Sequence, residues 1–304
     1  MSNGVIAELK ELIALRRAAQ TVCYRPEGRV RRIGNHLSLM RGRGMDFAEV
    51  RNYQAGDEIR HMEWRVTART GRPHVKLYQE ERERPVVILT DFNPSMYFGT
   101  RLAFKSVVAA RLAAVLAWTA IKQGDRIGGL LFSATNHHEF TPKGREIGVL
   151  PFLAALSQYT QERDNCAQSP AVKVLSQELL RLGRVTHPGS MVVLISDFYN
   201  MDKDCERHLS RIRAHNDVLV YHICDPLELT TPKPQQYAMT DGKQEILLDT
   251  TLKNVSQAYQ NYCAQRILQL QNQFKRLQIQ YEQVTAATDL ALLVRQTFPR
   301  RSNA

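Results

Sequence analysis

The chain has 304 residues, of which 43% are hydrophobic and 23% charged, a composition typical of globular proteins and unlike that of disordered ones. No run approaches the roughly 20 apolar residues that a membrane-spanning helix needs, and the first residues lack the apolar core of a signal peptide, so we expect a cytoplasmic protein. The formal net charge is +11, and five scattered cysteines without a CxxC pair disfavour a zinc site.

The excess of basic residues is concentrated near the amino terminus. Residues 25–76 hold twelve Lys and Arg against six Asp and Glu. Such a block can attract nucleic acid, an anionic membrane or an acidic protein surface. The bases alternate with acids and no aromatic stacking platform accompanies them, so we favour a hydrated structural segment. A nucleic-acid-binding protein that uses this segment remains an alternative.

The sequence pattern changes at about residue 84. Residues 5–20 carry apolar side chains at helical spacing, and residues 25–84 break into short pieces rich in Gly and Arg. We therefore expect residues 1–84 to form an amino-terminal helix and a basic, β-rich segment with several turns. Residues 85–298 are expected to form a separate α/β domain.

Within that domain, apolar strands alternate with helices. The expected strands are 86–92, 126–132, 191–198, 217–224 and 279–284; the expected helices are 101–123, 145–159, 202–214, 252–277 and 289–297, with another starting near residue 170 and hairpins near 137–140 and 241–242. This alternation predicts a mostly parallel sheet with helices on both faces.

Two of the strands end in an acid within nearly the same phrase, ILTDF with Asp91 and LISDF with Asp197. Ligand sites in open parallel sheets form at the carboxyl ends of the strands. If the two strands are neighbours, both carboxylates reach one crevice, where Asn93 and Ser95 add neutral oxygens. Such hard oxygen ligands suit Mg²⁺ or another oxygen-preferring divalent ion. An open coordination position on that ion could accept an acidic side chain of a partner.

The turn after the first strand resembles the metal-ion-dependent adhesion site of von Willebrand factor A (vWA) domains. The first loop of that site reads Asp-x-Ser-x-Ser, and its third loop supplies another Asp. Here Asn93 stands in place of the first Ser. The resemblance also implies a ligand from a second loop, for which Ser169 is our candidate and Thr160 the alternative.

A longer resemblance covers residues 30–200 closely. The phrases that carry it are GRGMDFAEVRNYQAGDEIRHMEWRVTARTGRPHVKLYQEERERP, VVILTDFNPSMYFGT, GDRIGGLLF and VVLISDF. They are similar to the domain-of-unknown-function family 58 (DUF58), whose members are vWA-like and commonly accompany MoxR-type AAA+ ATPases. The resemblance implies a non-enzymatic, metal-dependent protein–protein interaction module with no small-molecule substrate. It would act as an adaptor of such an ATPase in assembling or activating protein complexes.

The arginine-rich phrase has two interpretations. In the structural one, Asp57 pairs with Arg60 or Arg65, and Trp64 packs beneath the turn. In the other, the phrase forms a docking surface for an acidic partner. The arginines of that surface would be Arg43, Arg51, Arg65, Arg69 and Arg72.

The enzymatic alternative is an Mg²⁺-dependent phosphohydrolase with Asp91 as its nucleophile. Such enzymes carry a second carboxylate two residues later, where this chain has Asn93. The chain also has no GxxxxGK[ST] loop, and the nearest phrase, GTRLAFKS at 99–106, has the wrong spacing. We therefore do not expect an enzyme.

Overall fold

The computed structural model describes residues 4–20, 45–54, 56–80, 83–162, 174–240 and 245–298. They belong to two compact units: the larger contains 4–20 and 84–298, and the smaller contains the described residues between 45 and 83. No helix in these ranges combines the length and apolar character needed to cross a bilayer.

The smaller unit is built on two antiparallel strands. They are β1 (Met45–Asn52) and β2 (His74–Glu80), joined through the 3-10 helix η1 (Ile59–His61) and the helix α3 (Trp64–Thr70). The Glu63 side chain caps α3 by accepting a hydrogen bond from the Arg65 backbone N–H. Gly71 ends the helix with a φ of +71°, a left-handed conformation that glycine adopts without the steric cost of a Cβ.

The larger unit contains a six-stranded sheet. Its strands are β3 (Pro85–Asp91), β4 (Arg126–Phe132), β5 (His137–Lys143), β6 (Met191–Ser196), β7 (Asp217–Ile223) and β10 (Gln280–Val284). They lie in the order β10-β7-β6-β3-β4-β5 and run parallel except for β5 at the edge. This is the order of doubly wound α/β folds, and the winding reverses between β3 and β6.

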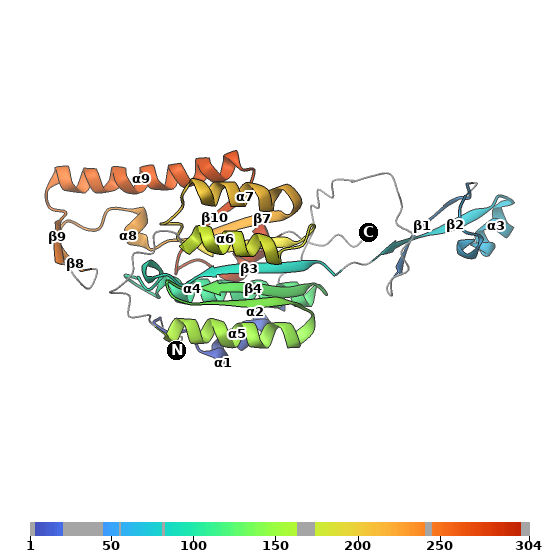
Figure 1. Ribbon diagram of the computed structural model, residues 1–304, viewed down its shortest axis with the longest axis horizontal. Coiled ribbons are helices and arrows are strands. Elements are labelled where there is room, and N and C mark those ends of the chain that lie inside the picture. Colours follow the sequence, from blue (N-terminus) through green and yellow to red (C-terminus); the bar gives the residue numbers. More distant parts are fainter. Residues whose placement is uncertain are drawn as a thin grey trace. The chain divides into compact units, whose positions relative to one another are not determined.

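Helices cover both faces of this sheet (Figure 1). On one face lie α4 (Lys105–Lys122), α5 (Arg145–Gln161) and α10 (Leu290–Thr297); on the other lie α6 (Val174–Val185), α7 (Lys203–His215) and α9 (Lys253–Arg276). Successive side chains of a strand point to opposite faces, so Val86 and Ile88 pack in the first layer while Val87 and Leu89 pack in the second. The predicted mostly parallel α/β fold is confirmed.

The amino-terminal residues complete the first of these layers. They form two short helices, α1 (Leu9–Ala14) and α2 (Arg16–Gln20). Leu12 is fully buried, and its carbonyl accepts a hydrogen bond of 3.1 Å from the indole N–H of Trp118 in α4. The structure therefore groups these helices with the α/β unit, whereas the sequence analysis placed them with the basic segment. The reason is that α4 is apolar nearly all round and needs a cover on the side away from the sheet.

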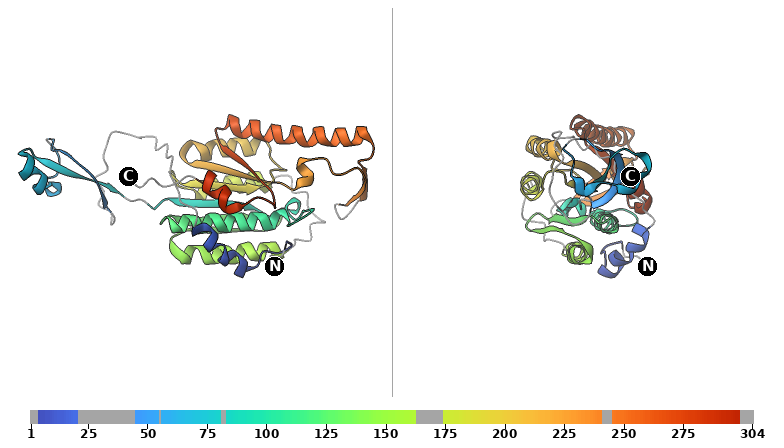
Figure 2. Two further views of the ribbon diagram at one scale, coloured as in Figure 1. Left: turned by 180° about the vertical axis from the view of Figure 1, so that it is seen from behind. Right: turned by 90° about the vertical axis from the view of Figure 1, so that its right-hand side faces the viewer.

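An excursion between β7 and β10 lies at the end of the sheet where the parallel strands finish (Figures 1 and 2). It comprises the short helix α8 (Pro226–Leu229), the antiparallel pair β8 (Gln236–Thr240) and β9 (Glu245–Asp249), and α9. The later half of α9 packs on the sheet through Leu270 and Phe274. Nearer its start, the Tyr259 hydroxyl donates a 2.8 Å hydrogen bond to the carbonyl of Leu227, which fastens α9 to α8.

Candidate functional site at the carboxyl ends of the strands

The structure brings the two predicted aspartates together at the point where the winding reverses. Asp91 is the last residue of β3, and Asp197 directly follows β6, the parallel neighbour of β3. The Ser196 hydroxyl donates a 2.6 Å hydrogen bond to Asp91 Oδ2, so the two strand ends are tied to each other. Parallel pairing places both carboxyl groups at one edge of the sheet, as a shared site requires.

Asp91 is held by uncharged hydrogen-bond donors. It is 3% exposed, and its Oδ1 accepts a 2.8 Å hydrogen bond from the backbone N–H of Asn93. Burial and the neighbouring charge of Asp197 raise the pKa of Asp91 to about 7. A carboxyl group shifted upward in this way has too little positive charge around it and favours either a proton or a bound cation.

Asp197 is held by a charged donor instead. Its Oδ2 accepts a 2.9 Å hydrogen bond from Lys105 Nζ, and the side chains of this pair are 2% and 3% exposed. Burial alone would raise the pKa of Asp197, but the Lys105 ammonium and hydrogen bonds from Ser95 and the Tyr199 backbone N–H lower it overall. Phe198, between Asp197 and Tyr199, has a φ of +53°, a strained backbone conformation of the kind that collects at functional sites.

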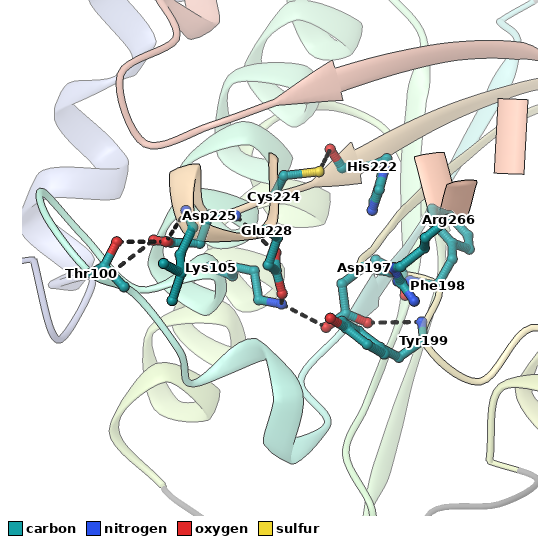
Figure 3. Close-up of polar contacts among 12 residues, drawn as sticks. Thr100, Lys105, Asp197, Phe198, Tyr199, His222, Cys224, Asp225, Glu228 and Arg266 are labelled. Carbon is teal, nitrogen blue, oxygen red and sulfur yellow. Dashed lines mark hydrogen bonds and ion pairs between the residues drawn. The ribbon is translucent and has the colours of Figure 1, made fainter. Parts of the chain in front are cut away.

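Lys105 also connects the site to α8. Its Nζ donates a second hydrogen bond, of 2.7 Å, to Glu228 Oε1, so the ammonium lies between two carboxylates (Figure 3). The other Glu228 oxygen accepts a hydrogen bond from the Asp225 backbone N–H within a capping box. Asp225 in turn accepts 2.5 and 2.8 Å hydrogen bonds from the hydroxyl and backbone N–H of Thr100. The loops after β3, β6 and β7 are thereby joined in one polar network.

An aromatic and a basic side chain border this network. The guanidinium carbon of Arg266, in α9, lies 3.5 Å from the ring centroid of Tyr199, and its Nη2 donates a 2.7 Å hydrogen bond to the Asp197 carbonyl. Tyr199 remains 42% exposed, so this part of the network faces solvent. Nearby His222 is buried and hydrogen-bonded to the Tyr281 hydroxyl, and burial lowers its pKa to about 4, which keeps it neutral.

The remaining predicted ligands differ in their placement. Asn93 is 2% exposed, and its Oδ1 has no hydrogen-bond partner among the described residues. The Ser95 side chain lies near Asp197 and helps to lower the pKa of that carboxyl group. Ser169 lies outside the described residues. The alternative, Thr160, is buried in α5, where its hydroxyl donates to the Ser157 carbonyl and accepts from the Ala7 backbone N–H.

A family comparison covers most of this chain. Residues 49–267 match the family described as "Protein of unknown function DUF58". The chain belongs to the DUF58 family.

Several known proteins are similar to this DUF58 protein. The Mycobacterium tuberculosis protein named "Uncharacterized protein Rv1480" is 29% identical over 255 residues, which cover 83% of this chain and 77% of that protein. Among solved structures, conserved hypothetical protein BatB from Bacteroides thetaiotaomicron has 13% identity and a TM-score of 0.43, covering 70% of this chain and 96% of that one. A von Willebrand factor type A protein from Catenulispora acidiphila has 15% identity and a TM-score of 0.33, covering 50% and 35%.

The smaller unit of the DUF58 protein corrects the structural interpretation of the arginine-rich phrase. Asp57 pairs with Arg51 at 2.7 Å, and not with Arg60 or Arg65, because the Gln54 backbone N–H bonds the same carboxylate and turns the loop back toward β1. Trp64 does not pack beneath the turn, since it is 63% exposed on the surface of α3.

The predicted docking arginines of this DUF58 protein fall into three groups. Arg43 lies outside the described residues. Arg51 is committed to Asp57 and to the Asn52 carbonyl. The exposed guanidinium groups of Arg65, Arg69 and Arg72 have no ion-pair partner among the described residues.

Lys105 and Glu228 are two members of the site that the sequence analysis missed, as it also missed Thr100, Tyr199, Asp225 and Arg266. A lone lysine in the apolar run FKSVVAARLAAVLAW is a signal, because a buried ammonium requires carboxylate partners. The phrase Asp225-Pro-Leu-Glu228 is a capping-box pattern and could have revealed α8. Neither signal shows that the two side chains meet, because they are 123 residues apart in the chain.

Proposed function

We propose that this DUF58 protein is a non-enzymatic protein-interaction module that binds Mg²⁺ at the carboxyl edge of its sheet. The ion would hold an acidic side chain of a partner protein. The observation that carries the proposal is that Asp91 and Asp197 are both buried and lie at the same edge of the sheet, at the point where the winding reverses. Sites in open α/β sheets form at this point.

Among the described residues, no group of three His, Cys, Asp or Glu side chains is arranged to hold a metal ion, so the support for a divalent cation comes from two other observations. The buried Asn93 Oδ1 has no hydrogen-bond partner in the described chain, and a buried oxygen in that state is stabilised by a cation. The second observation is charge. The network joins two cationic side chains, Lys105 and Arg266, to four carboxyl groups, so its net charge is −2 when all are ionised. The carboxyl groups are Asp91, Asp197, Asp225 and Glu228.

Asp91, Asp197, Asn93 and Ser95 would hold the ion, with Ser169 the candidate from the second loop. A bound Mg²⁺ would supply a positive charge with exchangeable coordination positions, which suits capture of a carboxylate. Asp91 lacks the second carboxylate that phosphohydrolases carry two residues after the nucleophile, because that position is Asn93. We therefore expect no turnover of phosphoesters in the presence of Mg²⁺.

The partner that we propose is a MoxR-type AAA+ ATPase or its client protein, as the DUF58 resemblance implies. Such a partner uses ATP, so we place the complex in the cytoplasm. Two large apolar side chains of the smaller unit offer a second contact surface: Trp64, at the start of α3, is 63% exposed, and Ile59, in η1, is 66% exposed. Arg65 and Arg69 are exposed on the same helix and, four residues apart, share one of its faces. Tryptophan and arginine are the side chains most enriched in the energetic centres of protein interfaces.

Metal binding is tested by titrating Mg²⁺ into the full chain with calorimetric detection, and repeating the titration on Asp91→Asn. The variant keeps the shape of the side chain and removes its charge. We expect the wild type to bind and the variant to lose at least tenfold in affinity. Ser157→Ala, in α5, is the control with unchanged affinity. Equal affinity in Asp91→Asn and the wild type would show that the site is misassigned.

The partner surface is tested by capture of the co-expressed ATPase, with Mg²⁺ and again with a chelator. The double variant Arg65→Glu/Arg69→Glu should lose the partner while its stability changes by no more than about 0.5 kcal/mol. Arg184→Glu/Arg211→Glu, on exposed positions of α6 and α7, changes the net charge equally and should still bind. If both double variants lose binding alike, overall charge is responsible and the α3 surface is not. Binding of RNA or DNA through α3 would instead show as a steep loss of affinity with added salt.

A further inference from the structure

The ammonium group of Lys105 lies between two carboxylates of the site, yet Lys105 is not one of the proposed metal ligands. We infer that Lys105 is a built-in cation of this site, which competes with a divalent ion for Asp197 and so sets the affinity of the site for metal. The inference rests on the proposed function, since it concerns the same carboxylates. It assigns a specificity-determining role to Lys105 and its second partner, Glu228.

Nothing in the helix itself favours a lysine at this position. Lys105 is the first residue of α4, where the helix dipole is positive and disfavours a cation. Its side chain is 3% exposed, so water does not compensate the charge. The two carboxylates at 2.9 and 2.7 Å do so. The ammonium is therefore retained as a charged group inside the site.

A divalent ion and this ammonium require the same carboxylate. Asp197 Oδ2 accepts the hydrogen bond from Lys105, and its Oδ1 accepts one from the Tyr199 backbone N–H. An ion that ligates Asp197 would therefore displace Lys105 or lie close to it, and like charges repel strongly in a buried setting. Lys105 thus lowers the affinity for metal, and it neutralises Asp197 when no metal is bound.

Glu228 makes this exchange possible. It lies on α8, and its carboxylate is fixed by the Asp225 backbone N–H at 2.9 Å, independently of Lys105. When a divalent ion binds the Asp197 carboxylate, the Lys105 ammonium can stay paired with Glu228, which neutralises its charge. Glu228 therefore favours metal binding although it is not one of the proposed ligands. The two side chains should act in opposite directions, which a general effect on folding does not produce.

The test is a titration of Mg²⁺ alone into the full chain, followed by calorimetry and by thermal melting. Lys105→Met, which keeps the length of the side chain, should bind Mg²⁺ at least tenfold more tightly than the wild type. Glu228→Gln should bind about tenfold more weakly. Lys203→Met is the matched control, because Lys203 is an exposed lysine at the first position of α7. Without metal, Lys105→Met should melt at a lower temperature than the wild type, and MgCl₂ should restore it where NaCl of equal ionic strength does not.

The outcomes separate this inference from the proposed function. If the wild type binds Mg²⁺ and Lys105→Met matches Lys203→Met within twofold, the inference is overturned and the metal site stands. If Lys105→Met binds Mg²⁺ and the wild type does not, the inference holds, because Lys105 then occupies the metal site of the wild type. If neither binds, both ideas fail. Should Lys105→Met not fold, Glu228→Gln decides alone, since unchanged or tighter Mg²⁺ binding in that variant contradicts the exchange.

Discussion

The ends of β3 and β6 carry almost the same phrase, yet their aspartates have opposite electrostatic environments. Asp91 is surrounded by the Ser196 hydroxyl and a backbone N–H, and its pKa rises to about 7. Asp197 faces the Lys105 ammonium, and its pKa is lowered. The two strands have nearly the same sequence, but the charged donor to Asp197 comes from Lys105, in the helix that follows β3. The group that a carboxylate meets, and not the phrase that contains it, decides its chemistry.

The sharpest way to test this difference is to replace each aspartate by asparagine. Asp197→Asn leaves Lys105 buried with a single carboxylate, and breaking a buried ion pair costs about 3–5 kcal/mol. Asp91→Asn keeps an acceptor for the Asn93 backbone N–H, its amide NH₂ can donate to the Ser196 hydroxyl oxygen, and it removes repulsion with Asp197, so we expect a change within about 1 kcal/mol. Urea denaturation at neutral pH without divalent ions measures both. Equal losses would mean that the two carboxyl groups are equivalent.

The pH dependence of stability should separate the two aspartates by sign. The pKa of Asp91 is higher folded than unfolded, so between about pH 4 and about pH 7 the folded state binds more protons at this group. Its contribution to the free energy of unfolding therefore falls as pH rises, by at most about 1.4 kcal/mol per pH unit. Asp197, with a lowered pKa, contributes stability that is lost only as pH falls below its usual value.

Urea midpoints across this range, for the wild type and Asp91→Asn, measure the effect. Relative to the variant, the wild type should become less stable as pH rises. Parallel curves for the two proteins would show that Asp91 does not hold its proton to neutral pH.

A smaller effect distinguishes the two serines that serve these aspartates. Ser196→Ala removes the donor to Asp91 Oδ2 and the acceptor for the Phe198 backbone N–H, so we expect a loss of about 1–2 kcal/mol. Ser95→Ala removes a hydroxyl that helps to lower the pKa of Asp197, which keeps its hydrogen bonds from Lys105 and the Tyr199 N–H, so this variant should cost about 0.5 kcal/mol. Thermal melting ranks the two variants, and a larger loss for Ser95→Ala would contradict the assignment of donors.

Most of the fold was predictable because hydrophobic periodicity and strand length are local properties. The apolar runs at β3, β4 and β6 were found within two residues of their observed ends. The grouping of α1 and α2 was not found, since amphipathic spacing shows that a helix has a buried face but not which surface covers it. The four-residue helix α8 is too short for any periodic signal.

The site was predictable only in part, for a related reason. The acids at the ends of β3 and β6 could be paired by topology, because parallel neighbours end at the same edge. The partners of Lys105 come from positions 92 and 123 residues away, and the pairing of Asp57 with Arg51 depends on how one loop turns. Such contacts are set by the packed fold, and no local spacing encodes them.

The two short helices at the start of the chain have a practical consequence for isolating the sheet. A fragment that began at Arg84 would preserve every strand of the sheet, yet it would lose Ala7, Leu12 and Ala19, which are buried against α4 and α5. It would also leave the Trp118 indole N–H without its hydrogen-bond acceptor and expose the apolar surface of α4 to solvent. We expect such a fragment to aggregate, and a version with residues 4–20 supplied as a separate peptide to remain in solution.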